Sequence, residues 1–241
     1  MHSPEIPEYL LNKHYNDRYF DVIDAFEEAK YIFIQGNNLI PRLSVMDSDQ
    51  RVISIGETGF GAGRTLAALI DELNKSDLLD VKVNYNSVEL HPLEARQMRE
   101  ILNQVKGCSP QIVNAILEHY SKIDITKSGW HSFSLLERFG SIDVNLWIGE
   151  ALEMVQSLKY PLDAWFLDGH GPKQNPQMWR TELLSAIGRK TASGGTAATF
   201  TVAGQVRRDL TDAGFLVTRC SGIGAKKTVL QAKLIKNPGI I

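Results

Sequence analysis

The sequence predicts an α/β fold in which helices cover both faces of a mostly parallel sheet. Segments with the β-branched composition of strands alternate with segments of helical periodicity over most of the 241 residues. The first pair, residues 52–70, passes from an apolar strand through alternating glycines into an apolar-periodic helix. Such alternation is typical of a doubly wound, Rossmann-like sheet.

The individual elements follow from local composition. A proline in the first turn and a glycine after the last turn are typical helix boundaries, as at Pro92 and Gly214. We expect helices at residues 63–74, 92–105, 151–158, 178–189 and 206–213. We expect strands at residues 51–56, 81–89, 143–148, 162–168, 196–201, 215–218 and 228–234, the last of them at an edge of the sheet.

Two segments depart from this alternation. Residues 30–35 have strand composition and lead through Gly36-Asn37-Asn38, a hairpin-type turn, into residues 39–43. The pattern predicts a small β-hairpin within an N-terminal extension, residues 1–50, ahead of a main domain, residues 51–241. Residues 107–140, with a helix at about 110–120, predict a helical insertion over the active-site edge.

Composition excludes several classes of protein. With 43% hydrophobic and 22% charged residues the chain can bury a full core, and no apolar run has the length of a membrane span. The N-terminus lacks a signal pattern, and Cys108 and Cys220 form no disulfide framework or metal knuckle. The six histidines lack H-x-x-x-H spacing, so we expect no metal site. Together these features lead us to expect a cytoplasmic protein without membrane attachment. The net charge of −2 indicates no global basic field for nucleic acid.

The turn after the first strand predicts a ligand site. Glu57 precedes the alternating Gly59, Gly61 and Gly63, where backbone N–H groups and a helix N-terminus face a ligand. A dinucleotide fingerprint needs G-x-G-x-x-G, and this spacing differs. An acid repels a pyrophosphate but suits the amine or sulfonium of S-adenosylmethionine, so we expect these residues and Phe60 to bind that cofactor. The alternative is a tight turn without a ligand.

Three acids follow strands whose carboxyl ends meet at the ligand edge of such a sheet. We expect Glu89 to accept hydrogen bonds from ribose hydroxyls, Glu150 to meet the adenine amino group, and Asp168 to face the methyl group. The alternatives are a helix-capping or solvated acid at Glu89 and an acid that caps its own turn at Asp168.

Asp168 also suggests which group accepts the methyl. An ammonium has no lone pair, whereas a carboxylate beside a primary amine can hold the amine in line and accept its proton. An aspartate at this position therefore favours N-methylation over O-methylation.

Longer runs of the sequence resemble one family. The segment from Asp163 to Gly169, with Asn175-Pro176 and Met178-Trp179, resembles the tRNA wobble-uridine methyltransferases: the stand-alone MnmD enzymes and the methyltransferase half of bifunctional MnmC. The similarity covers residues 17–230 and includes Glu57-Thr58-Gly59-Phe60-Gly61-x-Gly63, Glu89-x-x-Pro92-Leu93, Leu146-Trp147-x-Gly149, the run from Gly194 to Gly204, Val206-Arg207-Arg208 and Gly222-x-Gly224-x-Lys226.

The resemblance implies a class I, seven-stranded methyltransferase fold with S-adenosylmethionine as donor. It implies methylation of the exocyclic amine of 5-aminomethyl(-2-thio)uridine at the tRNA wobble position, and Asp168 matches the family's aspartate beside that amine. Two positions depart from the family pattern: His170-Gly171-Pro172 stands where Phe-Ala-Pro is common, and Glu150 replaces an aspartate. We expect no FAD-binding oxidase domain, so the enzymes that form the precursor are separate proteins.

If tRNA is the substrate, particular residues are expected to contact its phosphates and its target base. A phosphate-facing patch is expected of Lys173, Arg207, Arg208, Arg219, Lys226 and Lys227, with merely solvated side chains as the alternative. The target base must be splayed out, and Phe20, His170 or Trp179 is expected to stack on it.

Two other function classes stay open. One is a small-molecule or protein N-methyltransferase on the same scaffold, which the lack of a strongly basic composition keeps in consideration. The other is a non-catalytic nucleotide- or RNA-binding module. The glycine spacing disfavours an NAD oxidoreductase.

Overall fold

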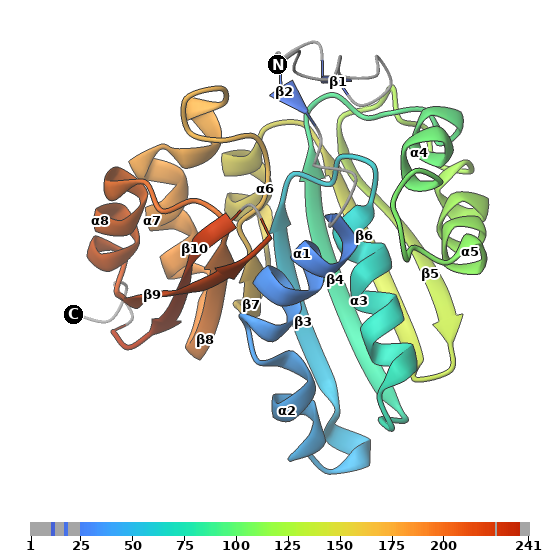
Figure 1. Ribbon diagram of the computed structural model, residues 1–241, viewed down its shortest axis with the longest axis horizontal. Coiled ribbons are helices and arrows are strands. Elements are labelled where there is room, and N and C mark those ends of the chain that lie inside the picture. Colours follow the sequence, from blue (N-terminus) through green and yellow to red (C-terminus); the bar gives the residue numbers. More distant parts are fainter. Residues whose placement is uncertain (1–10, 13–16, 19–24, 225, 237–241) are drawn as a thin grey trace.

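A computed structural model describes residues 11–12, 17–18, 25–224 and 226–236. A twisted sheet runs through its centre, with helices on both faces (Figure 1). In spatial order the strands are β5 (Gly129–Glu137), β6 (Gly140–Ile148), β4 (Val81–Glu89), β3 (Val52–Thr58), β7 (Leu162–Phe166), β8 (Thr191–Thr199), β10 (Lys226–Leu234) and β9 (Phe215–Ile223). All seven strands predicted for residues 51–241 are present.

Parallel pairing joins the five central strands, β6, β4, β3, β7 and β8. Their carboxyl ends therefore meet at one edge of the sheet, where ligands bind in doubly wound folds. β10 is antiparallel to both of its neighbours, β8 and β9. The prediction that residues 228–234 form an edge strand is wrong, because the chain inserts its last strand between β8 and β9 and leaves β9 at the edge.

The sheet has eight strands rather than the predicted seven, because the insertion at residues 107–140 supplies one. After helix α5 (Pro110–Tyr120), which was predicted, the chain forms β5, which pairs antiparallel with β6. In β5 the buried Phe133 and Leu135 alternate with exposed serines, as in a strand buried on one side. The insertion thus contributes a strand as well as a helix.

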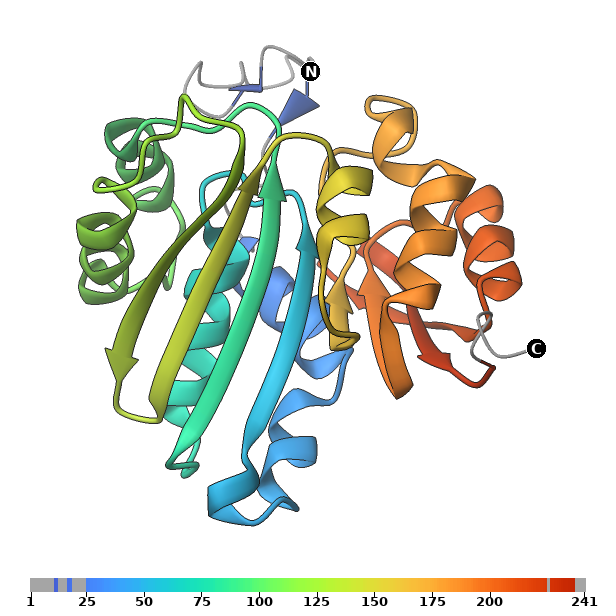
Figure 2. The same ribbon diagram turned by 180° about the vertical axis from the view of Figure 1, so that it is seen from behind.

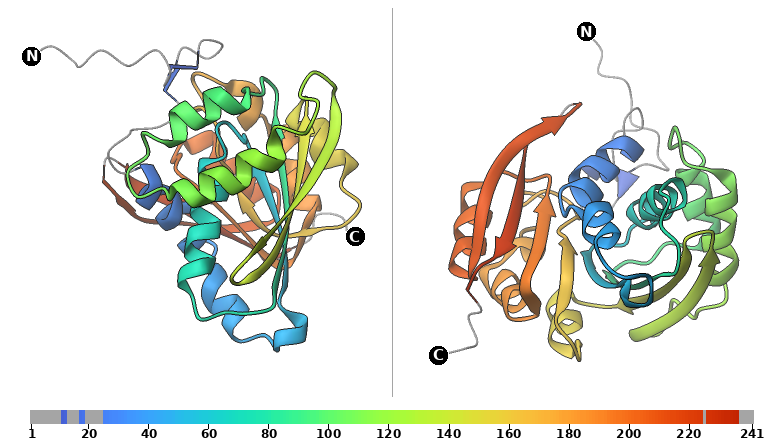
Figure 3. Two further views of the ribbon diagram at one scale, coloured as in Figure 1. Left: turned by 90° about the vertical axis from the view of Figure 1, so that its right-hand side faces the viewer. Right: turned by 90° about the horizontal axis from the view of Figure 1, so that it is seen from below.

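The helices form two layers, one on each face of the sheet (Figure 3). One layer holds α1 (Ala25–Ala29), the π-helix η2 (Lys30–Gln35), α2 (Leu39–Ser44), α3 (Arg64–Lys75), α4 (Ala95–Leu102) and α5. The other holds α6 (Ala151–Ser157), α7 (Thr181–Arg189) and α8 (Gly204–Asp212), seen from behind in Figure 2. Two 3₁₀ turns are η3 (Ser48–Gln50) and η4 (Pro176–Trp179). Within the described ranges no helix combines the length and apolarity that crossing a membrane requires.

The predicted β-hairpin at residues 30–43 is wrong, because this segment is helical. Ile32, Phe33 and Ile34 are each 1% exposed. A short continuous apolar run does not distinguish a strand from a helix that is buried on all sides, and here burial against the sheet selects the helix. An antiparallel pair of two-residue strands does precede it, formed by β1 (Leu11–Asn12) and β2 (Asp17–Arg18).

The N-terminal helices share the core of the main sheet. Phe26, Phe33 and Leu39 belong to the same buried cluster as the strands β3 and β4 and helix α3. Asn37, which is fully buried, donates to the Phe33 carbonyl at 2.8 Å and accepts from the Thr196 hydroxyl at 2.6 Å, so it joins the helix end to β8. Packing is continuous across residue 50, and a domain division there stays a prediction.

A buried ion cluster holds η2 against α3. The ammonium of Lys30 lies 2.7 Å from Asp71 and 3.1 Å from Glu27, and its side chain is only 4% exposed. Glu72 lies 3.3 Å away. Burial opposes the positive charge, but the hydrogen bonds to Asp71 and Glu27 outweigh it and raise the pKa of Lys30 above its ordinary value. The cluster is therefore ionised and fully paired.

We predict that Lys30→Ala lowers the free energy of unfolding by about 1.5–3 kcal/mol, because the buried Asp71 loses the charged hydrogen bond of its buried cation and keeps that of the exposed Lys75. Lys75→Ala is the matched control. It removes the other cation on Asp71, at 2.6 Å, but this side chain is 64% exposed, and an exposed pair is worth about 0–1 kcal/mol. Urea denaturation measures both variants, and equal losses would contradict the role of burial.

Candidate active site

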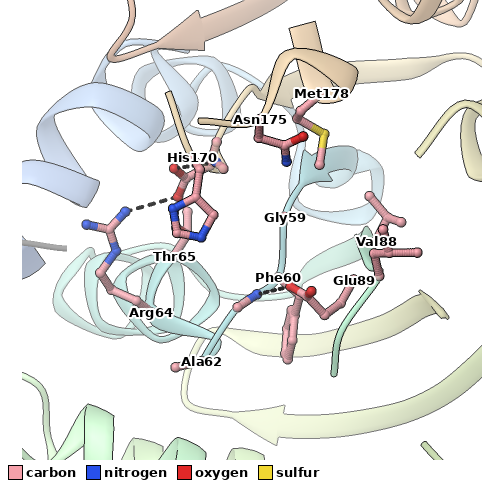
Figure 4. Close-up of a pocket in the computed structure, with 14 residues that line it drawn as sticks. Gly59, Phe60, Ala62, Arg64, Thr65, Val88, Glu89, His170, Asn175 and Met178 are labelled. Atoms are coloured by element: carbon pink, nitrogen blue, oxygen red, sulfur yellow. Dashed lines mark hydrogen bonds and ion pairs between the residues drawn. The ribbon is translucent and has the colours of Figure 1, made fainter. Parts of the chain in front are cut away.

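A hollow lies at the carboxyl edge of the sheet, between the turn after β3 and the loop after β7 (Figure 4). It encloses about 640 Å³, counting the part open to solvent. Three segments of the chain line it: Gly59, Phe60, Gly61, Ala62, Arg64 and Thr65; Val88, Glu89 and Leu90; and Asp168, Gly169, His170, Asn175 and Met178. Six of the residues predicted for the site are thus brought together: Gly59, Phe60, Gly61, Glu89, Asp168 and His170.

The insertion contributes no lining residue to this hollow within the described part of the chain, which corrects the prediction that it lies over the active-site edge. It supports the hollow from outside. The ring of Tyr120, in α5, stacks on that of Phe60 with centroids 6.0 Å apart. The Tyr120 hydroxyl also donates to the carbonyl of Leu93 at 2.7 Å, which fixes the ring behind the glycine turn.

The glycines of the turn are required by its backbone. Gly59, Gly61 and Gly63 have φ of 100°, 54° and 80°, a region that residues with a Cβ rarely adopt. A Cβ at Gly59 would lie 3.2 Å from the Cα of Gly169, so the turn after β3 and the loop after β7 touch at a pair of glycines. Gly63 precedes α3 and does not line the hollow.

Glu89 connects the end of β4 to the glycine turn. One carboxylate oxygen accepts from the Gly61 N–H at 2.8 Å and the other from the His91 N–H at 2.9 Å. A carboxylate has about four acceptor positions, so both oxygens can each accept a further donor from the hollow.

Asp168 is held by three donors. Its Oδ2 accepts from Arg64 at 3.0 Å and from the Thr65 hydroxyl at 3.3 Å, and its Oδ1 accepts from the Gly169 N–H at 2.8 Å. The side chains of Asp168 and Arg64 are 15% and 10% exposed. The carboxylate is therefore fixed at the wall of the hollow, with Oδ1 able to accept one more donor.

The sequence analysis missed Arg64 and Thr65. A signal was present, because an arginine in the first turn of a helix opposes the positive end of the helix dipole and therefore indicates a nearby anion. Asn175, 6% exposed, and Met178 were also missed as lining residues, although both belong to the motif that carries the family resemblance.

Glu57 lies beneath the hollow and does not line it. It is 1% exposed and accepts from the Ser87 hydroxyl at 2.6 Å. Burial raises the pKa of Glu57 to about 8, with a further contribution from the charge of Asp168, so its surroundings favour the neutral form. A direct contact of Glu57 with the ligand stays a prediction.

The other predicted aromatic and acidic residues lie in different places. Trp179 is 5% exposed, packs on Phe200 and donates to the His170 carbonyl at 2.8 Å, so it is a core residue and offers no open face to a base. Glu150 pairs with Arg180 at 3.6 Å and does not line the hollow; its contact with adenine stays a prediction. Phe20 lies outside the described residues.

The predicted basic residues are on the surface. Those that are exposed are Lys173, Arg207, Arg208, Arg219 and Lys227. Lys226 is half-buried, with its ammonium 4.9 Å from the centroid of the Phe200 ring. Phe200 packs on Trp179, which bonds His170, so Lys226 connects through these contacts to the rim of the hollow.

The part of the chain that the structure describes contains no group of three or more His, Cys, Asp or Glu side chains arranged to hold a metal ion.

Comparison with known sequences identifies relatives. The chain is 36% identical over 223 residues to the "tRNA 5-methylaminomethyl-2-thiouridine biosynthesis bifunctional protein MnmC" of Stutzerimonas stutzeri, which covers 92% of this chain and 33% of the relative. The protein of the same name from Caulobacter vibrioides is 34% identical over 218 residues, covering 90% of this chain and 35% of the relative. The chain thus spans about a third of the length of these relatives, and the matches confirm the family resemblance.

Comparison with solved structures agrees on the fold. The crystal structure of MNMC2 from Aquifex aeolicus superposes with a TM-score of 0.68 and 21% identity, covering 95% of this chain and 66% of that one. A model of the family described as "S-adenosyl-L-methionine-dependent methyltransferase" matches residues 110–235, just over half of the chain. This chain therefore belongs to that methyltransferase family, and its methyl donor is S-adenosylmethionine.

Proposed function

We propose that this chain methylates the exocyclic amine of 5-aminomethyl(-2-thio)uridine at the wobble position of tRNA. The observation that carries the proposal is the carboxylate of Asp168, fixed at the wall of the hollow with an acceptor position left on Oδ1. The printed name of the curated relatives supports tRNA as the substrate.

The residues of the hollow suit the donor. When bound, S-adenosylmethionine supplies a methyl group on a sulfonium. The two remaining acceptor positions of Glu89 match the two hydroxyls of a ribose. The N–H groups of the glycine turn and the N-terminus of α3 suit a carboxylate, and the Phe60 side chain adds apolar surface.

Asp168 would act on the methyl acceptor. Its Oδ1 accepts a hydrogen bond from the neutral amine and holds the nitrogen lone pair in line with the methyl carbon. With the donor bound, a C–N bond would form as the S–C bond of the donor broke, and the sulfur would keep the bonding electrons. The nitrogen then carries a positive charge, and Asp168 accepts one of its protons and passes it to solvent.

The surface beside the hollow suits RNA. Lys226 lies over the ring of Phe200, which packs on Trp179 and through it connects to the rim residue His170. The His170 ring would contact the target base. The exposed Lys173, Arg207 and Lys227 would contact phosphates.

We predict that Asp168→Asn slows methyl transfer by about 10²- to 10⁴-fold, because the amide cannot accept the proton, while binding of S-adenosylmethionine is kept. Purified protein is incubated with tRNA that carries the aminomethyl nucleoside, and nucleoside mass spectrometry measures the product. The exposed Asp212→Asn, at the end of α8, is the control and should have the wild-type rate.

Two results would contradict the proposal. A wild-type rate for Asp168→Asn would remove the role of Asp168. A wild-type protein that methylates small amines but leaves tRNA unmodified would favour the alternative of a small-molecule N-methyltransferase.

We predict that Glu89→Ala weakens binding of S-adenosylmethionine by about 1–3 kcal/mol, because hydrogen bonds to a half-buried charged acceptor are lost. Titration calorimetry measures the change. Glu100→Ala, which removes a 54% exposed carboxylate on α4, is the control. Unchanged affinity for Glu89→Ala would exclude the ribose contact.

We predict that Lys227→Ala weakens tRNA binding by a similar factor for all tRNAs, because a phosphate contact carries no sequence information. The slope of log K against log salt concentration should become shallower by about 0.7–0.9, as for one lost phosphate contact. Filter binding over a range of salt concentrations measures the slope, and an unchanged slope would place the RNA elsewhere.

A further inference from the structure

Two carboxyl groups meet behind the wall of the hollow, joined by one hydroxyl. Thr65 donates to Oδ2 of Asp168 at 3.3 Å and also hydrogen-bonds Glu57. Glu57 is 1% exposed, and the side chain of Asp168 is 15% exposed. Two negative charges this close together and this far from water repel strongly, so one of the two groups keeps a proton.

Among the described residues, Arg64 brings a positive charge to one member of this pair. It donates to Oδ2 of Asp168 at 3.0 Å, whereas Glu57 accepts from the Ser87 hydroxyl at 2.6 Å and bonds the Thr65 hydroxyl, both of which are neutral groups. A carboxylate beside a guanidinium is stabilised in its charged form, and a buried carboxyl without a cation is stabilised in its neutral form. The arrangement is therefore asymmetric, with the charge on the side of the hollow.

We propose that Arg64 is a positioning residue that keeps the negative charge of this pair on Asp168 and leaves the proton on Glu57. The inference rests on the proposed function, in which Asp168 must be ionised to accept a proton from the amine. Arg64 is not required to touch the substrate, because it acts through Asp168.

The other titratable groups near the pair are few among the described residues. From β4, Tyr85 is fully buried, and burial raises its pKa well above the ordinary value, so it stays neutral. From the loop after β7, His170 lines the same hollow as Arg64 and Asp168. Arg64 also donates to the Ala25 carbonyl at 3.3 Å, so a purely structural role must be separated by experiment.

The first experiment is the pH dependence of kcat at saturating donor and tRNA. In Arg64→Gln the acid limb should move to higher pH by about one to three units, because Asp168 now competes with Glu57 for the proton. Arg64→Lys keeps the charge and should keep the limb near its wild-type position. Thr65→Val removes a neutral donor from the same oxygen, so it should move the limb in the same direction but by less than Arg64→Gln.

A double variant tests the competition itself. Adding Glu57→Gln to Arg64→Gln should move the acid limb back toward its wild-type position, because only one carboxyl then remains. A limb that stays in place in Arg64→Gln, with a uniformly lower kcat, would overturn the proposal in favour of a structural role. Equal damage by Arg64→Lys and Arg64→Gln would do the same.

The second experiment needs no methyl acceptor. Carboxyl-carbon NMR of protein labelled with ¹³C at Asp and Glu side chains should show, at neutral pH, a protonated Glu57 and an ionised Asp168, assigned with Glu57→Gln and Asp168→Asn. In Arg64→Gln the Asp168 signal should move toward the protonated position. A protonated Asp168 in the wild type would overturn the proposal. A wild type that fails to methylate tRNA but gives the expected NMR result contradicts the proposed function and not this inference.

The stability of the fold gives a third, independent readout. The pKa of Glu57 is raised from an ordinary 4.5 to about 8, so between these values the folded state binds more protons than the unfolded state. Relative to Glu57→Gln, the wild type should therefore lose unfolding free energy as the pH rises from about 4.5 to about 8. A difference that is independent of pH would mean that Glu57 is already ionised, which contradicts the proposal.

Discussion

The site depends on the contact between the turn after β3 and the loop after β7. The strands are parallel neighbours, so their carboxyl ends lie side by side, and the hydroxyl of Thr58 donates to the Asp168 carbonyl at 2.9 Å. Gly59 and Gly169 approach so closely that a Cβ on Gly59 would be 3.2 Å from the other backbone. This approach brings Asp168 to the first turn of α3, where Arg64 and Thr65 bind it, and thereby defines one wall of the hollow.

Helix α3 takes part in both the packing of the fold and the site, because it carries buried charged residues at two positions along its length. In its middle, Asp71 pairs with Lys30 and fixes the N-terminal helices against the sheet. At its start, Arg64 pairs with Asp168 and donates to the Ala25 carbonyl. A buried charge is tolerated only with a partner in good geometry, so each pair fixes the position of the element that supplies the partner. The same helix therefore orders both the packing and the reactive carboxylate.

The sequence predicts those site residues whose location depends only on their following the carboxyl end of a strand. Glu89 and Asp168 follow strands of a parallel sheet, and the topology alone brings such residues to one edge. The glycine turn was predictable for the same reason. The direction and ionisation of a side chain were not, as Glu57 illustrates: it belongs to the same motif, but it is buried inside the protein, where burial raises its pKa. Trp179 likewise reads as an exposed aromatic beside the site and is buried against Phe200.

The sequence by itself determined the alternation of strands and helices, because periodicity and glycine or proline boundaries are local properties of the chain. It also determined which acids end the parallel strands. The tertiary structure decided the rest. Residues 30–35 form a helix because the sheet and α3 bury them on several sides, and β10 lies inside the sheet because pairing partners are chosen across the whole chain. The pairing of Arg64 with Asp168 joins residues 104 positions apart, and only the folded chain brings them within 3.0 Å.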